Sequence, residues 1–177
     1  HVVMDSLGVM DLEAMAAAGI TALIANAAGL MDVATSSEAI FQYYERTLAG
    51  ETKRAADYFI DVYVTLGINM YGIPPDYEKI LKALPRYLHR DRVVGVGEIG
   101  LDPSSNTCPD LGKQEEILVA QLKLAREYNK TAVLHLPRME RLKWVERYFK
   151  LIDGTKLERG KVVITHADAA TTKMITD

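Results

Sequence analysis

The sequence predicts an α/β fold in which parallel strands alternate with helices, on the strength of three observations. Short apolar runs recur along the 177 residues and are separated by stretches with helical periodicity. The runs are apolar at nearly every position, as burial on both faces of a parallel sheet requires. Two of them end in histidine and one carries a glutamate at its end. Two architectures satisfy this pattern: an open doubly wound sheet and a (β/α)8 barrel.

The polar residues at the strand ends favour the barrel. Residues 95–100, GVGEIG, lack the glycine fingerprint of dinucleotide-binding folds, because a glutamate and an isoleucine occupy the loop and no helix follows. In a (β/α)8 barrel, functional side chains come from the C-terminal ends of several strands. Glu98, His135 and His166 hold that position on three successive strands. We therefore predict a TIM-barrel type of fold.

The predicted barrel is incomplete in this chain. About six strand positions can be counted, whereas a full barrel has eight and takes about 250 residues. We expect one domain over residues 1–177, incomplete at both ends, with an exposed apolar gap where the last two units belong.

Local signals place the elements of the first half. A segment rich in Ala, Met and Leu is followed by Gly19, which is typical of a helix and its C-terminal stop. Ser36 and Ser37 supply helix N-cap chemistry. The expected elements are a helix over residues 12–18, a strand over 20–27, a helix from 36–37 to about 50, a helix over 51–59 and a strand within 59–69.

The second half repeats the alternation. A helix is expected to begin at residues 74–76, with Ile80, Leu84 and Leu88 on one face, and Pro85 should kink or split it. The other expected elements are a strand over 93–97, a helix over 113–128 with Leu118, Leu122 and Ala125 on one side, a strand over 131–135, a helix over 139–152 with Gly154 close after its end, and a strand over 161–166.

Glu98 needs a partner, because a buried carboxylate costs several kcal/mol unless it is paired, hydrogen-bonded or bound to a metal. We expect its partners to be His135 and His166, through a shared cation. Carboxylate and imidazole ligands suit zinc, manganese or iron. The alternatives are a carboxylate held by backbone donors and histidines that form ordinary hydrogen bonds.

Residues close after these positions are further candidates. Asp102 could orient a ligand or belong to the turn before Pro103. Arg138 could hold an anionic substrate oxygen or cap a loop. We assign Asp102 and Arg138 as candidate substrate-binding residues. Asp168 could be the N-cap of a following helix or a residue of the site.

Composition limits the function classes. The net charge of −3 argues against a broad basic surface that wraps nucleic acid. It leaves open a metal site that acts on phosphate, because a metal supplies its own positive charge. A single cysteine excludes an intrachain disulfide and indicates a reducing compartment, so we expect a cytoplasmic protein. No apolar run approaches the roughly 20 residues of a membrane span.

Four segments resemble a known family. Residues 93–102, VVGVGEIGLD, are similar to the glutamate motif of the TatD-related metal-dependent hydrolases, which are amidohydrolase-like TIM barrels. Residues 114–135 resemble the next helix and strand of that family, which end in a metal-binding histidine. Residues 161–166, KVVITH, resemble the following strand and its histidine. Residues 1–5, HVVMD, resemble the opening H-x-H-[LM]-D motif.

The resemblance implies a metal centre with two positions. Glu98 would be a bridging ligand and a catalytic residue, His135 and His166 would complete one position, and His1 would help to hold the other. Val3 stands where the family motif has its second histidine. The later aspartate of the family has no counterpart, because Asp177 follows His166 too closely. One or two divalent ions are therefore expected, with zinc first and manganese, magnesium or iron as alternatives.

The resemblance further implies a metal-dependent hydrolase. The expected reaction is attack of metal-activated water on a phosphodiester, as in a deoxyribonuclease. The expected partner is nucleic acid or a small phosphodiester, with no membrane. A homo-oligomer is compatible with the sequence. Val3 and the missing aspartate keep two alternatives open: an amide or lactone hydrolase, and a non-catalytic metal-binding barrel that binds a small ligand or a partner.

Overall fold

A computed structural model describes residues 2–27, 34–104 and 108–176. The strands form one parallel sheet whose spatial order follows the chain. They are β1 (Ala22–Ala27), β2 (Asp61–Leu66), β3 (Val93–Gly100), β4 (Thr131–His135) and β5 (Val162–Thr165). The helices are α1 (Val9–Ala17), α2 (Ser37–Glu45), α3 (Thr52–Ala56), α4 (Tyr77–Leu88), α5 (Leu111–Glu127), α6 (Arg141–Thr155) and α7 (Ala169–Thr176).

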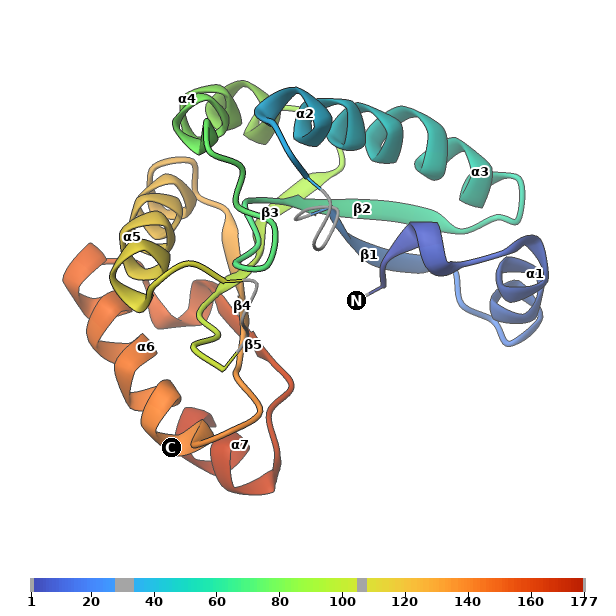
Figure 1. The fold of residues 1–177 in the computed structure, drawn as a ribbon. Helices are drawn as coiled ribbons and strands as arrows, with labels where there is room; N and C mark the ends of the chain where they lie inside the picture. Colours follow the sequence, from blue (N-terminus) through green and yellow to red (C-terminus); the bar gives the residue numbers. More distant parts are fainter. Residues whose placement is uncertain (1, 28–33, 105–107, 177) are drawn as a thin grey trace.

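The sheet is a section of a barrel. A doubly wound sheet reverses its strand order at a switch point, whereas here every strand lies beside its neighbour in sequence. The sheet curls, and helices α2, α4, α5 and α6 lie along its outer side (Figure 1). Val2 adds a parallel bridge to β1 through Ala25, at the edge opposite β5. The prediction of an incomplete TIM barrel with about six strand positions is confirmed.

The core lies between the outer face of the sheet and these helices. Ile80, Leu84 and Leu88 of α4 are fully buried, as their shared face predicted. Burying one such side chain contributes about 1.5–3 kcal/mol. The predicted face of α5, Leu118, Leu122 and Ala125, is buried as well.

The inner face of the sheet carries apolar side chains that remain accessible. Ile24 of β1 and Val163 of β5 are 44% and 50% exposed. A cavity of about 350 Å³ spans this face and is lined by Ile24, Asn26, Thr65, Val94, Thr131, Val133 and Val163. The inner face of this barrel section is therefore apolar and open. No helix in the described ranges is both long and apolar enough to cross a membrane.

Several expected boundaries differ from the structure. Pro85 does not split α4, which runs from Tyr77 to Leu88, because the buried face of the helix continues to Leu88 and its packing outweighs the hydrogen bond that the proline removes. Strand β2 lies within the expected range 59–69 and begins at Asp61, since Phe59 is exposed with a positive φ of 60°. Strand β3 continues beyond residue 97 to Gly100.

The expected ends of two helices were also wrong. The helix expected to end near residue 50 is α2 up to Glu45, followed by a π-helical turn over Arg46–Glu51 that leads directly into α3. Helix α6 passes through Gly154 and ends at Thr155. The left-handed residue that terminates α6 is Lys156, with a φ of 59°, so Gly154 is a helical residue.

Candidate metal centre

Three neighbouring strands bring Glu98, His135 and His166 to one point. Glu98 lies near the end of β3, His135 ends β4, and His166 directly follows β5. Oε1 of Glu98 is 3.5 Å from Nε2 of His166 and 3.7 Å from Nδ1 of His135. One potential ligand atom from each residue lies within 4.8 Å of the other two. The imidazole rings are 5.0 Å apart.

An irregularity in β3 sets the position of Glu98. Gly97 pairs with Val133 and Ile99 pairs with Leu134, so Glu98 is an extra residue in the ladder. The Gly97–Glu98 peptide bond is cis. A bulge of this kind re-aims a side chain, and such bulges are common beside active sites. Glu98 is therefore displaced from the regular alternation of the strand.

The surroundings of Glu98 keep its carboxylate ionised. Its side chain is 14% exposed, and burial alone would raise its pKa. The neighbouring His135, the hydroxyl of Thr165 that donates to Oε1, and His166 outweigh burial, so the pKa lies below its ordinary value. The cluster thus offers one carboxylate oxygen and two imidazole nitrogens.

This donor set fits a divalent metal ion. Bonds of 2.0–2.2 Å in a tetrahedral arrangement separate the ligand atoms by about 3.4 Å. The Glu98–His166 and Glu98–His135 separations of 3.5 and 3.7 Å are close to that value. Two histidines and a carboxylate, with a fourth position open to water, are a known ligand set of catalytic zinc.

A second group of polar residues lies behind His135. Its Nε2 is 3.3 Å from the hydroxyl of Tyr71 and 4.0 Å from Oδ2 of Asp102, and the Tyr71 hydroxyl donates to that same oxygen. Burial raises the pKa of Asp102, but hydrogen bonds from Ser104 and Tyr71 outweigh it and lower the pKa. The carboxylate is 9% exposed, so its surroundings favour an orienting role over contact with substrate.

His166 lies on the open side of the cluster. Its side chain is 46% exposed, and its backbone has a φ of 60°. A non-glycine residue in this conformation costs about 1–3 kcal/mol, and such residues gather at functional sites. The conformation thus agrees with a functional constraint on His166.

The remaining candidates have varied surroundings. His1 lies outside the described residues. Val3 is described and is 40% exposed.

Asp168 accepts a hydrogen bond from the backbone of Thr171 in the first turn of α7, so it is the helix N-cap. That bond, together with the Thr171 hydroxyl and Arg141, lowers the pKa of Asp168 to about 2.

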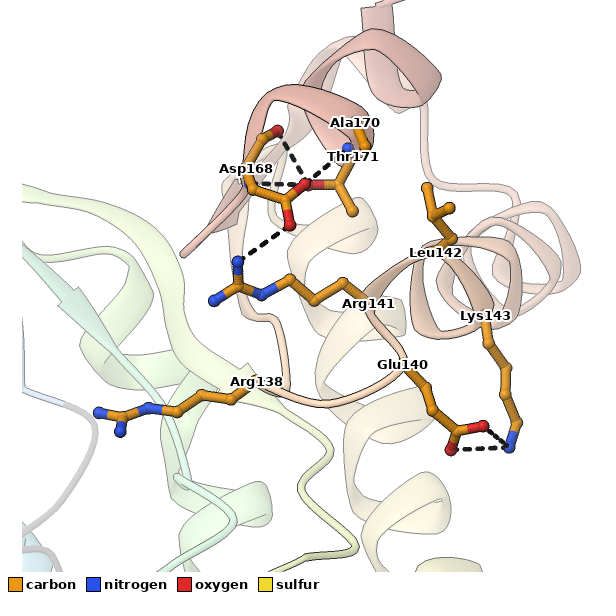
Figure 2. A pocket seen from close by; sticks show the side chains of 8 residues that line it. All are labelled: Arg138, Glu140, Arg141, Leu142, Lys143, Asp168, Ala170 and Thr171. Atoms are coloured by element: carbon orange, nitrogen blue, oxygen red, sulfur yellow. Dashed lines mark hydrogen bonds and ion pairs between the residues drawn. The ribbon is translucent and has the colours of Figure 1, made fainter.

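Arg138 lies at a pocket lined by residues that follow His135 and His166 in the chain. The pocket has a volume of about 510 Å³ and is lined by Arg138, Glu140, Arg141, Leu142, Lys143, Asp168, Ala170 and Thr171. Figure 2 shows the Arg141–Asp168 and Lys143–Glu140 ion pairs, with Arg138 extending away from both. Within the described residues, the Arg138 guanidinium forms no hydrogen bond or ion pair, so it is available to an anion.

Sequence reasoning missed Tyr71, Asn69 and Thr165. Thr165 directly precedes His166 on β5, and its hydroxyl reaches Glu98 of β3 past the intervening strand β4. The amide of Asn69 donates to the backbone carbonyl of Glu98 over 3.4 Å. Asn69 and Tyr71 follow β2 in a loop with no recognisable motif, so no signal in the sequence identifies them.

Comparison with known proteins gives one family match, one related protein and several solved structures of similar fold. A family model described as TatD related DNase matches residues 5–176. A protein of Methanocaldococcus jannaschii, described as an uncharacterized metal-dependent hydrolase, is 29% identical over 175 residues, which cover 99% of this chain and 67% of the relative.

Two solved structures share the fold. The TatD-like protein of Archaeoglobus fulgidus superposes with a TM-score of 0.86 at 23% identity, covering 99% of this chain and 71% of its own. A TatD homolog of Escherichia coli gives a TM-score of 0.62 at 23% identity, covering 93% of this chain and 55% of its own. At 23% sequence identity, these two structural similarities are evidence for the fold alone.

Proposed function

The chain belongs to the TatD-related DNase family, and we propose that this metal-dependent hydrolase cleaves phosphodiester bonds in nucleic acid or in small phosphodiesters. The convergence of Glu98, His135 and His166 carries the proposal. A divalent metal ion, when bound, lowers the pKa of water to near neutrality and polarises a phosphoryl oxygen. Nucleic acid as the substrate is supported by the family description.

Each residue of the cluster has a role in this proposal. His135 through Nδ1, His166 through Nε2 and Glu98 through Oε1 would hold the ion, and zinc is the first candidate because imidazole nitrogens would supply two of the three ligands. Glu98 is ionised and is proposed as the catalytic carboxylate, because it would lie beside the water that a bound ion activates. The Thr165 hydroxyl holds Glu98 in place. His1 is proposed as a further ligand.

The proposal predicts metal-dependent cleavage of phosphodiesters. Protein treated with a chelator should not hydrolyse bis(p-nitrophenyl) phosphate or labelled single- and double-stranded oligonucleotides, and added zinc or manganese should restore cleavage. A p-nitrophenyl ester and a lactone serve as competing substrates. Turnover of the ester or lactone alone would support the amidase or lactonase alternative. Stoichiometric metal without any turnover would support a non-catalytic metal-binding barrel.

Arg138 is proposed to contact a phosphate of the substrate, since it is exposed and unpaired among the described residues at a pocket beside the cluster. Arg138→Ala should raise KM for oligonucleotides of any sequence with little change in kcat. It should also reduce the slope of log(kcat/KM) against log salt by about 0.7–0.9, the loss of one phosphate contact. Arg159→Ala, which removes an exposed arginine paired with Asp153, is the control. An unchanged salt slope for Arg138→Ala would remove Arg138 from the binding site.

A further inference from the structure

We propose that Tyr71 is a positioning residue that holds His135 in the one tautomer able to present Nδ1 to the metal centre. The inference rests on the metal centre of the proposed function and concerns a residue outside the family motifs compared above. Tyr71 follows β2, far in sequence from both His135 and Asp102, and its hydroxyl lies between them.

The geometry places the Tyr71 hydroxyl in a chain of hydrogen bonds. Its oxygen is 3.3 Å from Nε2 of His135 and contacts Oδ2 of Asp102. The Tyr71 and His135 rings meet edge to face, with centroids 5.7 Å apart and planes at 83°. The other oxygen of Asp102 accepts from the backbone N–H and the hydroxyl of Ser104, at 3.0 and 2.6 Å. Ser104 therefore fixes the carboxylate with Oδ2 facing Tyr71.

Counting donors and acceptors assigns the hydrogen atoms in the Asp102–Tyr71–His135 hydrogen-bond network. An ionised carboxylate only accepts, so the phenolic hydrogen of Tyr71 goes to Asp102. The oxygen of Tyr71 then offers lone pairs to His135, so this hydrogen bond forms when Nε2 carries the hydrogen. The competing acceptor for the imidazole hydrogen, Oε1 of Glu98, lies farther from the ring, 3.7 Å from Nδ1, than the Tyr71 oxygen does from Nε2, at 3.3 Å. A neutral imidazole with hydrogen on Nε2 has its free lone pair on Nδ1. Nδ1 is the nitrogen that faces Oε1 of Glu98, at 3.7 Å.

Asp102 alone is too far away to perform this role. Its Oδ2 lies 4.0 Å from Nε2 of His135, beyond the 2.7–3.2 Å of a direct hydrogen bond. Tyr71 bridges that gap. A hydrogen bond from the second nitrogen of a histidine ligand typically fixes its tautomer and ring orientation, and its loss costs about 10–100-fold in metal affinity.

The loop that carries Tyr71 is held by buried contacts that need no metal. The side chain of Gln121 on α5 accepts from the N–H of Ile68 at 2.7 Å and donates to its carbonyl at 3.1 Å. The amide oxygen of Asn69 accepts from the N–H of Tyr71 at 3.0 Å. Gln121 and Asn69 are 1% and 4% exposed. Tyr71 should therefore orient His135 before any ion binds.

The test uses the metal-free protein and then its metal affinity. Long-range ¹H–¹⁵N spectra at about pH 9, where an ordinary histidine is neutral, report which ring nitrogen carries the hydrogen. The His135 signals are assigned by their loss in His135→Gln. Wild type should show His135 protonated at Nε2, and Tyr71→Phe should show a mixture of tautomers. Zinc affinity, measured by competition with a chromophoric chelator, should fall about 10–100-fold in Tyr71→Phe.

Tyr128→Phe is the matched control. The Tyr128 ring meets His89 edge to face at 5.2 Å and 79°, but no hydroxyl–imidazole hydrogen bond joins them among the described residues. This variant should leave the tautomers and zinc affinity unchanged. Wild-type His135 protonated at Nδ1 would overturn the inference, and so would an unchanged tautomer in Tyr71→Phe. The wild-type spectrum alone tests which ring nitrogen of His135 carries the hydrogen, even if Tyr71→Phe fails to fold. The outcome is independent of phosphodiester cleavage, so the proposed substrate can fail while this inference holds.

Discussion

Glu98→Gln is expected to lower kcat/KM for phosphodiester hydrolysis by about 10³-fold or more and to abolish tight metal binding. The carboxylate is the only negative group in the Glu98–His135–His166 cluster, and both imidazoles lie within 3.7 Å of Oε1. Glutamine keeps the shape and can still accept from Thr165. It supplies no charge to a cation, and metal activation contributes several kcal/mol to such reactions.

Glu51→Gln separates this effect from the general cost of removing a buried carboxylate. Glu51 is 7% exposed and forms ion pairs with Arg54 and Arg46, in the turn between α2 and α3. Its replacement should lower the free energy of unfolding while leaving metal content and activity unchanged. Metal content by elemental analysis, kcat/KM and urea unfolding are measured on both variants. A Glu98→Gln protein that keeps its metal and its rate within about tenfold would show that the centre lies elsewhere.

Features that depend on local periodicity were predictable from the sequence. Strand β4 has the predicted bounds, residues 131–135, because its apolar run is short and ends in a polar residue. The buried faces of α4 and α5 follow from i, i+4 spacing. The strand-end position of His135 and His166 predicted that they would meet, because parallel strands place their C-terminal ends at one edge.

Features that depend on the pairing of distant segments were not predictable. The bulge at Glu98 exists only in relation to β4, where Val133 and Leu134 pair with residues two apart on β3. The position of Tyr71 depends on Gln121 of α5, a residue 50 positions later in the chain whose buried side-chain amide holds the loop. Gly154 and Pro85 carry strong local signals for helix ends, but the packing of α6 and α4 outweighs them.

Gly97→Ala is expected to lower stability and metal affinity together. A Cβ at Gly97 would lie 2.6 Å from Cβ of Val133, 3.0 Å from its carbonyl oxygen and 3.2 Å from its Cα. These atoms belong to or adjoin the backbone of β4, so they cannot rotate away. Strands β3 and β4 must separate to admit the methyl group, and overpacking of this kind costs about 1–3 kcal/mol or more.

The two strands would separate at the register shift of β3 that positions Glu98. The residue of β4 at this point, Val133, is two residues before His135, so metal affinity should fall together with stability. Gly154→Ala is the matched control, because nothing lies within 4 Å of its added Cβ and the residue is helical. That change should raise the free energy of unfolding by up to about 1 kcal/mol. Urea unfolding measures the free energy of unfolding of both variants, and m-values that match the wild type would show that the changes report stability alone. Equal stability of the two proteins would mean that β3 and β4 are not in contact at Gly97, and that the bulge does not position Glu98.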